Sequence, residues 1–238
     1  MTVTIGTPRY EVKIPTEPYR LHEIETWLRL HPTHWRVAYP PRQVNNIYFD
    51  TTDYRCLHDN LSGVGQRSKL RLRWYGPALD VVTGPRLELK RREGNVGWKE
   101  IYPLDITLRL THTAWADLRR QLRAAATGRP ALLLARFGHP ALINTYQRRY
   151  YVAPDGRVRL TLDTDLRAYS QRFSGRPNLR QRAVTEDRVI IELKAPADDV
   201  SFQALTDALA RFPLRPDRHS KFVHGMLAAP DFDEVFLP

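Results

Sequence analysis

The sequence predicts an α+β fold in which a large antiparallel sheet carries a few added helices. At least eight segments alternate apolar and polar residues with the period of two that is typical of a β-strand. Helical patterns are fewer, and they do not alternate with the strands in the regular order of a parallel βαβ fold. Strands of this number and length can close into a barrel, whose interior receives every second side chain.

The N-terminal part of the chain predicts a strand, a helix and a second strand. "RYEVKI" (9–14) places its charged residues on one face and its apolar residues on the other. A helix is expected over 17–30, where apolar residues recur at helical spacing and Pro18 suits a first turn. "VNNIYFD" (44–50) predicts the next strand, which is closed by the turn-like "DTTDY".

Three further strands and a helix are expected in the middle of the chain. The strands are "KLRLRW" (69–74), "RLELKRR" (86–92) and "VGWKEIY" (96–102). The helix spans 111–128, has an apolar stripe at helical spacing, and ends at a glycine. Thr113 is its expected N-cap because a hydroxyl oxygen can accept from the first free backbone N–H groups.

The C-terminal part predicts a hairpin, a third strand and two helices. The hairpin is joined by the turn "APDGR", and its second strand places Asp163 and Asp165 on one face. A polar, basic segment precedes the last strand and is expected to form a loop or lid. The predicted elements are strands 145–152, 157–165 and 187–196, the loop 170–187, and helices 198–213 and 219–227.

Composition limits the class of partner. The chain has 238 residues, a formal net charge of +11 and a pI of about 10.0, a balance that favours polyanions such as nucleic acid, anionic membranes or phosphorylated small molecules. A lone cysteine, Cys56, excludes an internal disulfide and CxxC motifs and is expected to be a buried thiol. Neither a secretory signal nor an apolar run of bilayer length is visible, so we expect a soluble cytoplasmic protein.

Lysine is rare, which makes each lysine informative. Of 37 basic residues, only six are lysine, so the other 37 − 6 = 31 are arginine. Lysine supplies a compact charge with rotatable donors, which the planar fork of arginine cannot copy at a tight site. Five of the six lysines fall within predicted strands. The six are Lys13, Lys69, Lys90, Lys99, Lys194 and Lys221.

Charged faces recur on the predicted strands. Lys69, Arg71 and Arg73 share one face of their strand, and apolar residues that include Trp74 form the other. A single strand of this kind normally turns its charged face to water. Three strands, however, carry Glu-x-Lys in identical phase: Glu11 with Lys13, Glu88 with Lys90, and Glu192 with Lys194. Inside a barrel such faces would be unstable without counter-ions, and a polyphosphate chain with a divalent metal would neutralise both sets of charges.

Eight motifs, in order from about residue 9 to about residue 227, resemble those of the vacuolar transporter chaperone (VTC) domain. This domain is the polyphosphate polymerase branch of the CYTH-like triphosphate tunnel metalloenzymes. The motifs are "RYEVKI", "VNNIYFDTTDY", "KLRLRWYG", "LELKRREG…GWKE", "TYQRRYY", "RLTLDTDL", "IIELKAP" and "SKFVHGM". The resemblance implies a single domain (1–238) with an eight-stranded antiparallel tunnel barrel and helices packed outside it. The implied activity is transfer of the γ-phosphoryl of ATP to inorganic polyphosphate, with pyrophosphate as a primer and no nucleic-acid partner.

The resemblance also implies roles for individual residues. Glu192, with Glu11, would hold Mn²⁺ or Mg²⁺. Lys69 lies outside the family motif and is expected at the rim. The residues implied to be catalytic are Arg71, Arg73, Lys90, Arg148, Arg159 and Lys221. Those implied to bind substrate are Lys13, Lys99, Tyr146, Lys194 and Ser220.

One position departs from the wider superfamily, and two alternative functions stay open. Arg9 stands where the first glutamate of a Glu-x-Glu-x-Lys strand is expected, which favours the polymerase branch over a two-metal hydrolase. The first alternative is a metal-dependent triphosphatase or short-chain polyphosphatase of the same fold. The second is a non-catalytic module that binds polyphosphate or nucleic acid. The acceptor, the chain length, the preferred metal and the oligomeric state also stay open.

Overall fold

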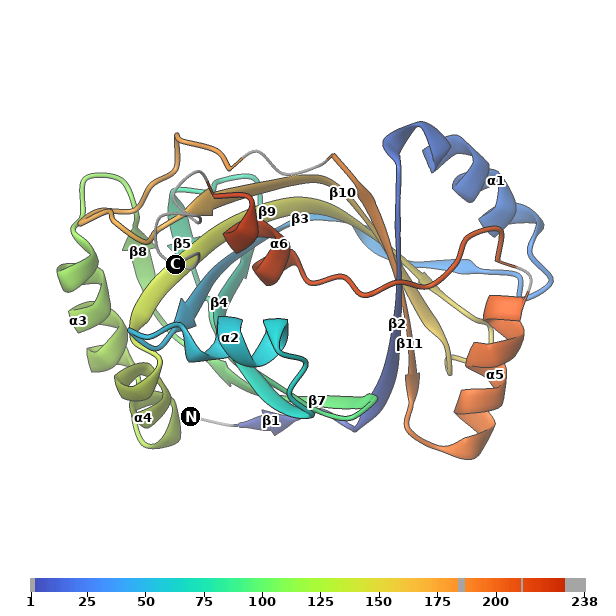
Figure 1. Cartoon of the computed structure of the whole chain (residues 1–238), viewed down its shortest axis with the longest axis horizontal. Helices are drawn as coiled ribbons and strands as arrows, with labels where there is room; N and C mark the ends of the chain where they lie inside the picture. The colour runs from blue at the N-terminus through green and yellow to red at the C-terminus, as the bar shows by residue number, and fades with distance from the viewer. Residues whose placement is uncertain (1–2, 184–186, 211, 230–238) are drawn as a thin grey trace.

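A closed barrel of eight antiparallel strands forms the centre of the computed structural model, which describes residues 3–183, 187–210 and 212–229 (Figure 1). Its strands are β2 (Arg9–Thr16), β3 (Arg36–Asp50), β4 (Gln66–Tyr75), β6 (Arg86–Glu93), β7 (Val96–Pro103), β9 (His139–Val152), β10 (Arg159–Ser170) and β11 (Val189–Pro196). They follow one another around the barrel in the order β7-β2-β11-β10-β9-β3-β4-β6, and β6 pairs back onto β7. The predicted α+β barrel is therefore confirmed.

The N-terminal segment closes the barrel at a short seam. β2 pairs with β7 through Arg9 opposite Gly97 and Tyr10 opposite Val96. Just before β2, the strand β1 (Thr4–Ile5) pairs with β7 as well. The N-terminal segment thus follows the edge of β7 before β2 turns away to pair along its whole length with β11.

Six α-helices in the described part of the chain surround the barrel. They are α1 (Leu21–Leu30), α2 (Arg55–Leu61), α3 (Trp115–Ala125), α4 (Arg129–Arg136), α5 (Asp199–Ala210) and α6 (Lys221–Leu227), and a 3-10 turn, η1 (Pro18–Arg20), precedes α1. A small sheet pairs β5 (Val81–Thr83) with β8 (Thr107–Arg109). In Figure 1, α3 and α4 lie on one side of the barrel, α1 and α5 on the other, and α2 and α6 near the viewer. No helix of the described residues has the length and apolar character needed to span a bilayer.

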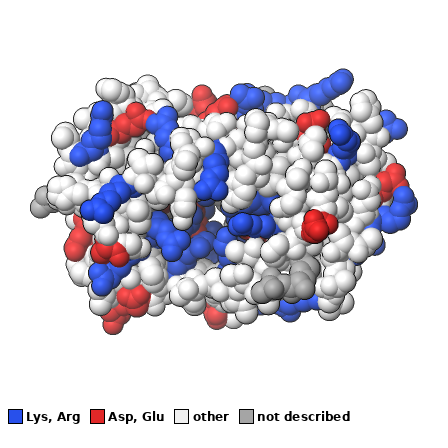
Figure 2. All heavy atoms as spheres, turned by 180° about the vertical axis from the view of Figure 1, so that it is seen from behind, with Lys and Arg blue, Asp and Glu red and all other residues white. Residues whose placement is uncertain are grey.

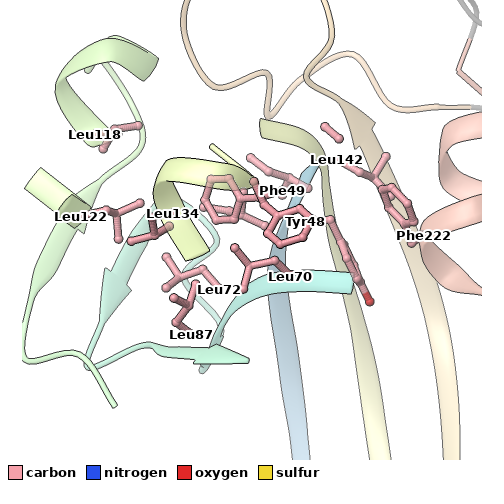
Figure 3. Close-up of a cluster of buried hydrophobic side chains, with 14 of the residues drawn as sticks. Tyr48, Phe49, Leu70, Leu72, Leu87, Leu118, Leu122, Leu134, Leu142 and Phe222 are labelled. Carbon is pink, nitrogen blue, oxygen red and sulfur yellow. The ribbon is translucent and has the colours of Figure 1, made fainter. Parts of the chain in front are cut away.

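Two apolar cores cover the outside of the barrel. The larger joins the outer faces of β3, β4 and β6 to α3 and α4, with Leu70, Leu72 and Leu122 near its centre (Figure 3). The smaller joins β2, β10 and β11 to α1 and α5 through residues such as Ile14 and Leu193. Because successive residues of a strand point to opposite faces, burying these apolar residues outside turns the charged residues into the lumen.

The helix α6 is fixed against one end of the barrel. Phe222 stacks on Tyr48 of β3 with ring centroids 5.1 Å apart. Gly225 packs so closely on β9 that a Cβ atom there would lie 2.7 Å from Leu142 Cδ2. Ser220 is the N-cap, since its hydroxyl accepts from the backbone N–H of Val223. The predicted terminal helix is therefore present, and it is held at the lumen.

The helix predicted over 111–128 is present as α3 but is shorter, and α4 follows it outside the predicted range as a helix that was not predicted. α3 begins at Trp115 after Ala114, so the expected N-cap role of Thr113 is wrong. The predicted terminal glycine, Gly128, does not cap α3. It has φ +66 and redirects the chain into α4, whose first turn contains a proline.

A bulge in β10 changes the face of a predicted acidic residue. The pairing with β9 shifts register between Thr164 and Arg167, and Asp165 has φ +53. Asp165 therefore turns outward and pairs with Arg167, whereas Asp163 stays inside and fully buried. The prediction that both aspartates share one face is wrong. The loop predicted at 170–187 has no helix or strand over 171–183, and residues 184–186 lie outside the described part. The predicted helix 198–213 is present as α5, and residue 211 lies outside the described part.

Candidate active site

Among the residues that the structure describes, the lumen carries more cations than carboxylates. Inward positions alternate along each strand, and the strand pairings bring the inward residues of neighbouring strands side by side, as in Glu192 opposite Lys13 and Arg71 opposite Glu88. The carboxylates are Glu11, Glu88, Asp163 and Glu192. The cations around them are Arg9, Lys13, Lys69, Arg71, Arg73, Lys90, Lys99, Arg148, Lys194 and Lys221. Such an excess favours an anionic ligand.

Glu11 and Glu192 form a neighbouring pair of carboxylates on adjacent strands. Lys90 donates to both oxygens of Glu11 at 2.7 and 2.8 Å, and Lys13 lies 3.3 Å from Glu11. Lys194 donates to Glu192 at 2.6 Å. Burial and the adjacent Glu192 raise the pKa of Glu11, but the lysines outweigh them and hold it at about 2. The pKa of Glu192 is likewise well below its usual value, despite burial, because of Lys194 and other cations. Both groups are ionised at neutral pH.

Glu88 of β6 lies between cations of its two neighbouring strands, β4 and β7. Two nitrogens of Arg71 donate to its Oε2, at 2.5 and 2.9 Å, and Lys99 donates to Oε1 at 3.2 Å. The side chain is only 1% exposed. Burial opposes ionisation, but the charges of Arg71, Arg73 and Lys99 hold the pKa of Glu88 well below its usual value. Its partner is therefore not Lys90, two residues along its own strand.

Asp163 is clamped between β9 and α6. Arg148 donates to both of its oxygens, at 2.5 and 2.6 Å, and Lys221 lies 2.7 Å from Oδ2. Asp163 is fully buried, yet these two cations lower its pKa to about 2 against the opposing effect of burial. This ion pair ties the predicted catalytic residues Arg148 and Lys221 to one another.

Tyr146 links three predicted phosphate-binding cations. Its hydroxyl accepts from Arg73 at 3.1 Å, and Arg148 and Lys221 lie 5.2 and 4.9 Å from its ring centre. Arg73 also donates to Asn46 at 2.8 Å, and it is 5% exposed. The charges are thereby held in fixed positions around one point of the lumen. Asn46 was not predicted as a site residue, because an asparagine in a strand has no charge pattern that would single it out.

Lys69 reaches into the lumen, so its expected place at the rim is wrong. Its Nζ donates to the Ser220 hydroxyl at 2.7 Å, next to α6. Burial and the nearby charges of Lys13 and Lys90 hold the pKa of Lys69 well below its usual value. The rim assignment fails because a strand pattern alone does not show that α6 closes over this position. Lys13, on the facing strand, donates to the backbone carbonyl of His219 at 2.9 Å.

Two more lumen lysines have pKa values close to neutral pH. Burial lowers the pKa of Lys194 to about 7, against the attraction of Glu192 and Glu11. Burial also lowers the pKa of Lys99 to about 8, with Arg71 and Arg73 adding to the shift. Arg159, in contrast, lies at the exposed start of β10, opposite Lys194 of β11. All predicted site residues except Arg159 therefore lie within the contacts described above.

The lumen is accessible from outside. Figure 2 shows a hollow near the centre of one face of the molecule, bordered by lysine and arginine atoms. A cavity of about 440 Å³ also lies between α6 and the bulge of β10, with Tyr146 and Lys221 in its wall. Arg188 and Arg218 line the same cavity. The surroundings of the lumen are therefore cationic as well.

The sequence matches one family model, that of the VTC domain, over residues 8–229. No curated protein matches it. Among solved structures, the chain is similar to the PH1819 protein from Pyrococcus horikoshii OT3, with 14% identity, a TM-score of 0.44, and coverage of 89% of this chain and 94% of that one. It is also similar to a chain of the Schizosaccharomyces pombe Mediator head module (11%, TM-score 0.44, 88% and 97%). It is similar as well to the S. pombe Pct1 RNA triphosphatase, with 11% identity, a TM-score of 0.32, and coverage of 87% of this chain and 77% of that one.

Proposed function

The chain belongs to the VTC domain family, and we propose that it is a polyphosphate polymerase that transfers the γ-phosphoryl group of ATP to inorganic polyphosphate. One observation carries the proposal: a closed barrel whose lumen holds a surplus of fixed cations around buried carboxylates. A surplus of buried positive charge is unfavourable in an empty lumen and is neutralised by a chain of phosphates.

In the proposed reaction, a terminal oxygen of the acceptor chain attacks the γ-phosphorus of ATP. The bond from that phosphorus to the bridging oxygen of the β-phosphate breaks, and ADP leaves. Transfer of this kind depends on positioning and on neutralising charge, and needs no nucleophilic side chain. Arg73, Arg148 and Lys221, which converge on Tyr146, would hold the transferred group.

The remaining cations would line the path of the phosphate chain. Lys13, Lys90, Lys99 and Lys194 face the lumen from β2, β6, β7 and β11. Arg71 and Ser220 would add contacts on either side of Lys69. Arg159, at the exposed start of its strand, would act at an entrance rather than at the reacting phosphate.

Glu11 and Glu192 fit the role of carboxylate ligands for a divalent metal. They are adjacent and ionised, and oxygen is the donor that Mg²⁺ and Mn²⁺ prefer. Among the described residues no cluster of three or more Asp, Glu, His or Cys could hold a metal alone, so phosphate oxygens would complete the shell. When bound, the metal would supply Lewis-acid neutralisation of phosphate charge. Lys90 and Lys194, which now contact these carboxylates, would be free to turn to the phosphates.

The test is an incubation of the purified protein with ATP, Mn²⁺ and a pyrophosphate primer, followed by gel analysis for polyphosphate and quantification of ADP. We expect polymer and ADP in step, and loss of both in Arg148→Ala. Arg120→Ala, on the exposed surface of α3, is the matched control and should behave like the wild type. Release of orthophosphate without polymer would support a triphosphatase instead. Tight polyphosphate binding without turnover would support a binding module.

A further inference from the structure

Three tyrosines surround an arginine at one end of the barrel. The guanidinium carbon of Arg42 lies 5.2 Å from the ring centre of Tyr39, 5.6 Å from that of Tyr75 and 5.4 Å from that of Tyr150. Tyr39 and Tyr150 also meet edge to face, with centroids 5.7 Å apart. The four residues come from three adjacent strands, β3, β4 and β9. We call them the tyrosine cluster.

The tyrosine cluster is open to solvent. Tyr39 is 57% exposed and Tyr75 is 38% exposed, and Arg42 is exposed as well. Two prolines follow Tyr39, and the pairing of β3 with β9 shifts register on both sides of Tyr39. In a regular strand, Tyr39 and Arg42 would point to opposite faces, because they are three residues apart. The irregular part of β3 brings both of them against the ring of Tyr150. Exposed aromatic groups gathered in one place are typical of a binding surface.

The cluster continues the inner face of the barrel. Tyr150 is two residues from Arg148 on β9, so both side chains face the same way, about 7 Å apart along the strand. Arg42 is the cross-strand partner of Arg148. Burial raises the pKa of the Tyr150 hydroxyl, and the nearby charge of Arg148 opposes this rise. The end held by α6, marked by Leu142, lies eight residues away on β9, or about 26 Å. The cluster therefore stands at the mouth opposite α6.

We propose that the tyrosine cluster binds the base of the nucleoside triphosphate, so that nucleotide enters at this mouth with its phosphates pointing toward Arg148. This inference rests on the proposed function in taking a nucleoside triphosphate as the donor. Tyrosine rings and a guanidinium plane are the groups on which nucleobases stack. The spacing of about 7 Å between Tyr150 and Arg148 along the strand is similar to the length of the ribose and α-phosphate, which separate the base from the β- and γ-phosphates. Stacking is tolerant of base identity, so ATP and GTP should bind similarly.

The experiment compares two ligands by isothermal titration calorimetry: a non-hydrolysable β,γ-imido analogue of ATP, and inorganic tripolyphosphate, which has no base. In Tyr39→Ala and Tyr150→Ala we expect affinity for the ATP analogue to fall about tenfold, while affinity for tripolyphosphate stays within about twofold. Tyr39→Phe, which keeps the ring, should retain the wild-type affinity. Tyr19→Ala is the matched control, because Tyr19 is 82% exposed and lies in η1.

The outcomes separate this inference from the proposed function. Equal losses for both ligands, or no loss for either, would overturn the base-binding role even if the wild type makes polyphosphate. If the wild type makes no polymer but the variants lose affinity for the ATP analogue alone, the base site stands and the polymerase proposal fails. Retained tripolyphosphate binding shows that each variant has kept a folded lumen.

Discussion

The four lumen carboxylates form two contrasting pairs. Glu88 and Asp163 are 1% and 0% exposed, and each is held by two nitrogens of one arginine. Glu11 and Glu192 lie beside one another, and their closest partners are lysines. An arginine clamp is planar, permanently charged and hard to replace, whereas lysine is a mobile single charge whose pKa shifts on burial. Glu88 and Asp163 therefore hold their arginines in fixed positions, whereas Glu11 and Glu192 can exchange their lysine partners for other cations.

Asp163→Asn should have the largest effect, and the effect should be on stability. The change leaves Arg148 and Lys221, 9% and 11% exposed, without their main counter-charge. Breaking a buried ion pair by removing one partner lowers the free energy of unfolding by about 3–5 kcal/mol. Chemical denaturation in the absence of ligand measures it. Asp165→Asn is the matched control, because this exposed aspartate should matter by less than about 0.5 kcal/mol. Equal losses in the two variants would remove the distinction between inside and outside at the β10 bulge.

Glu192→Gln should spare the fold and abolish most of the activity. Loss of one charged ligand of the proposed metal should lower the rate of the proposed polymer synthesis about 100-fold, or about 2.7 kcal/mol in the activation barrier. Stability should fall less than in Asp163→Asn, because Lys194, with a pKa of about 7, can release its proton when its partner is lost. Tripolyphosphate binding in EDTA should persist. Glu93→Gln, an exposed change at the end of β6, is the control. A large loss of stability with normal metal dependence would place Glu192 with the arginine-clamped pair.

Lys194 should make phosphate binding depend on pH. A lysine is cationic below its pKa, and burial lowers that of Lys194 to about 7, so its charge is lost as the pH rises from 6 to 9. Tripolyphosphate affinity, measured without metal, should therefore fall by up to about tenfold more in the wild type than in Lys194→Arg over this range. Arginine stays charged throughout, and comparing the two profiles cancels the titration of the ligand itself. Parallel profiles would contradict the assignment.

The inner and outer faces of the barrel could be predicted from the sequence because alternation is a local property of each strand. Arg71 and Arg73 face inward, and Leu70 and Leu72 are buried outside, as their spacing predicts. The pairings could not be predicted, because they depend on how strands align. Glu88 carries Lys90 in phase along its own strand yet pairs with Arg71 of the next strand.

Features that depend on how helices and strands pack against one another also could not be predicted. The position of α6 decides that Lys69 is inside, and the bulge of β10 decides that Asp165 is outside. The tyrosine cluster joins Tyr39, Tyr75 and Tyr150, which are separated by 36 and 75 positions in the sequence. No single segment of sequence therefore suggests it. The family resemblance supplied the roles of Glu11 and Glu192, and those roles remain predictions that depend on adjacency rather than on either strand alone.

With tripolyphosphate bound, a divalent metal should stabilise the protein further, and only through the lysine-held pair, Glu11 and Glu192. At a concentration of about ten times its Kd, a bound ion adds about 1.4 kcal/mol, which raises the Tm of a protein of this size by about 3–5 °C. The rise in Tm on adding Mn²⁺ should vanish in Glu11→Gln and Glu192→Gln and persist in Glu93→Gln. In Lys90→Met the rise should be larger, because the metal no longer competes with the ammonium group that contacts both oxygens of Glu11. An equal rise in all four variants would mean that the metal binds elsewhere, and the exchangeable character assigned to Glu11 and Glu192 would then be wrong.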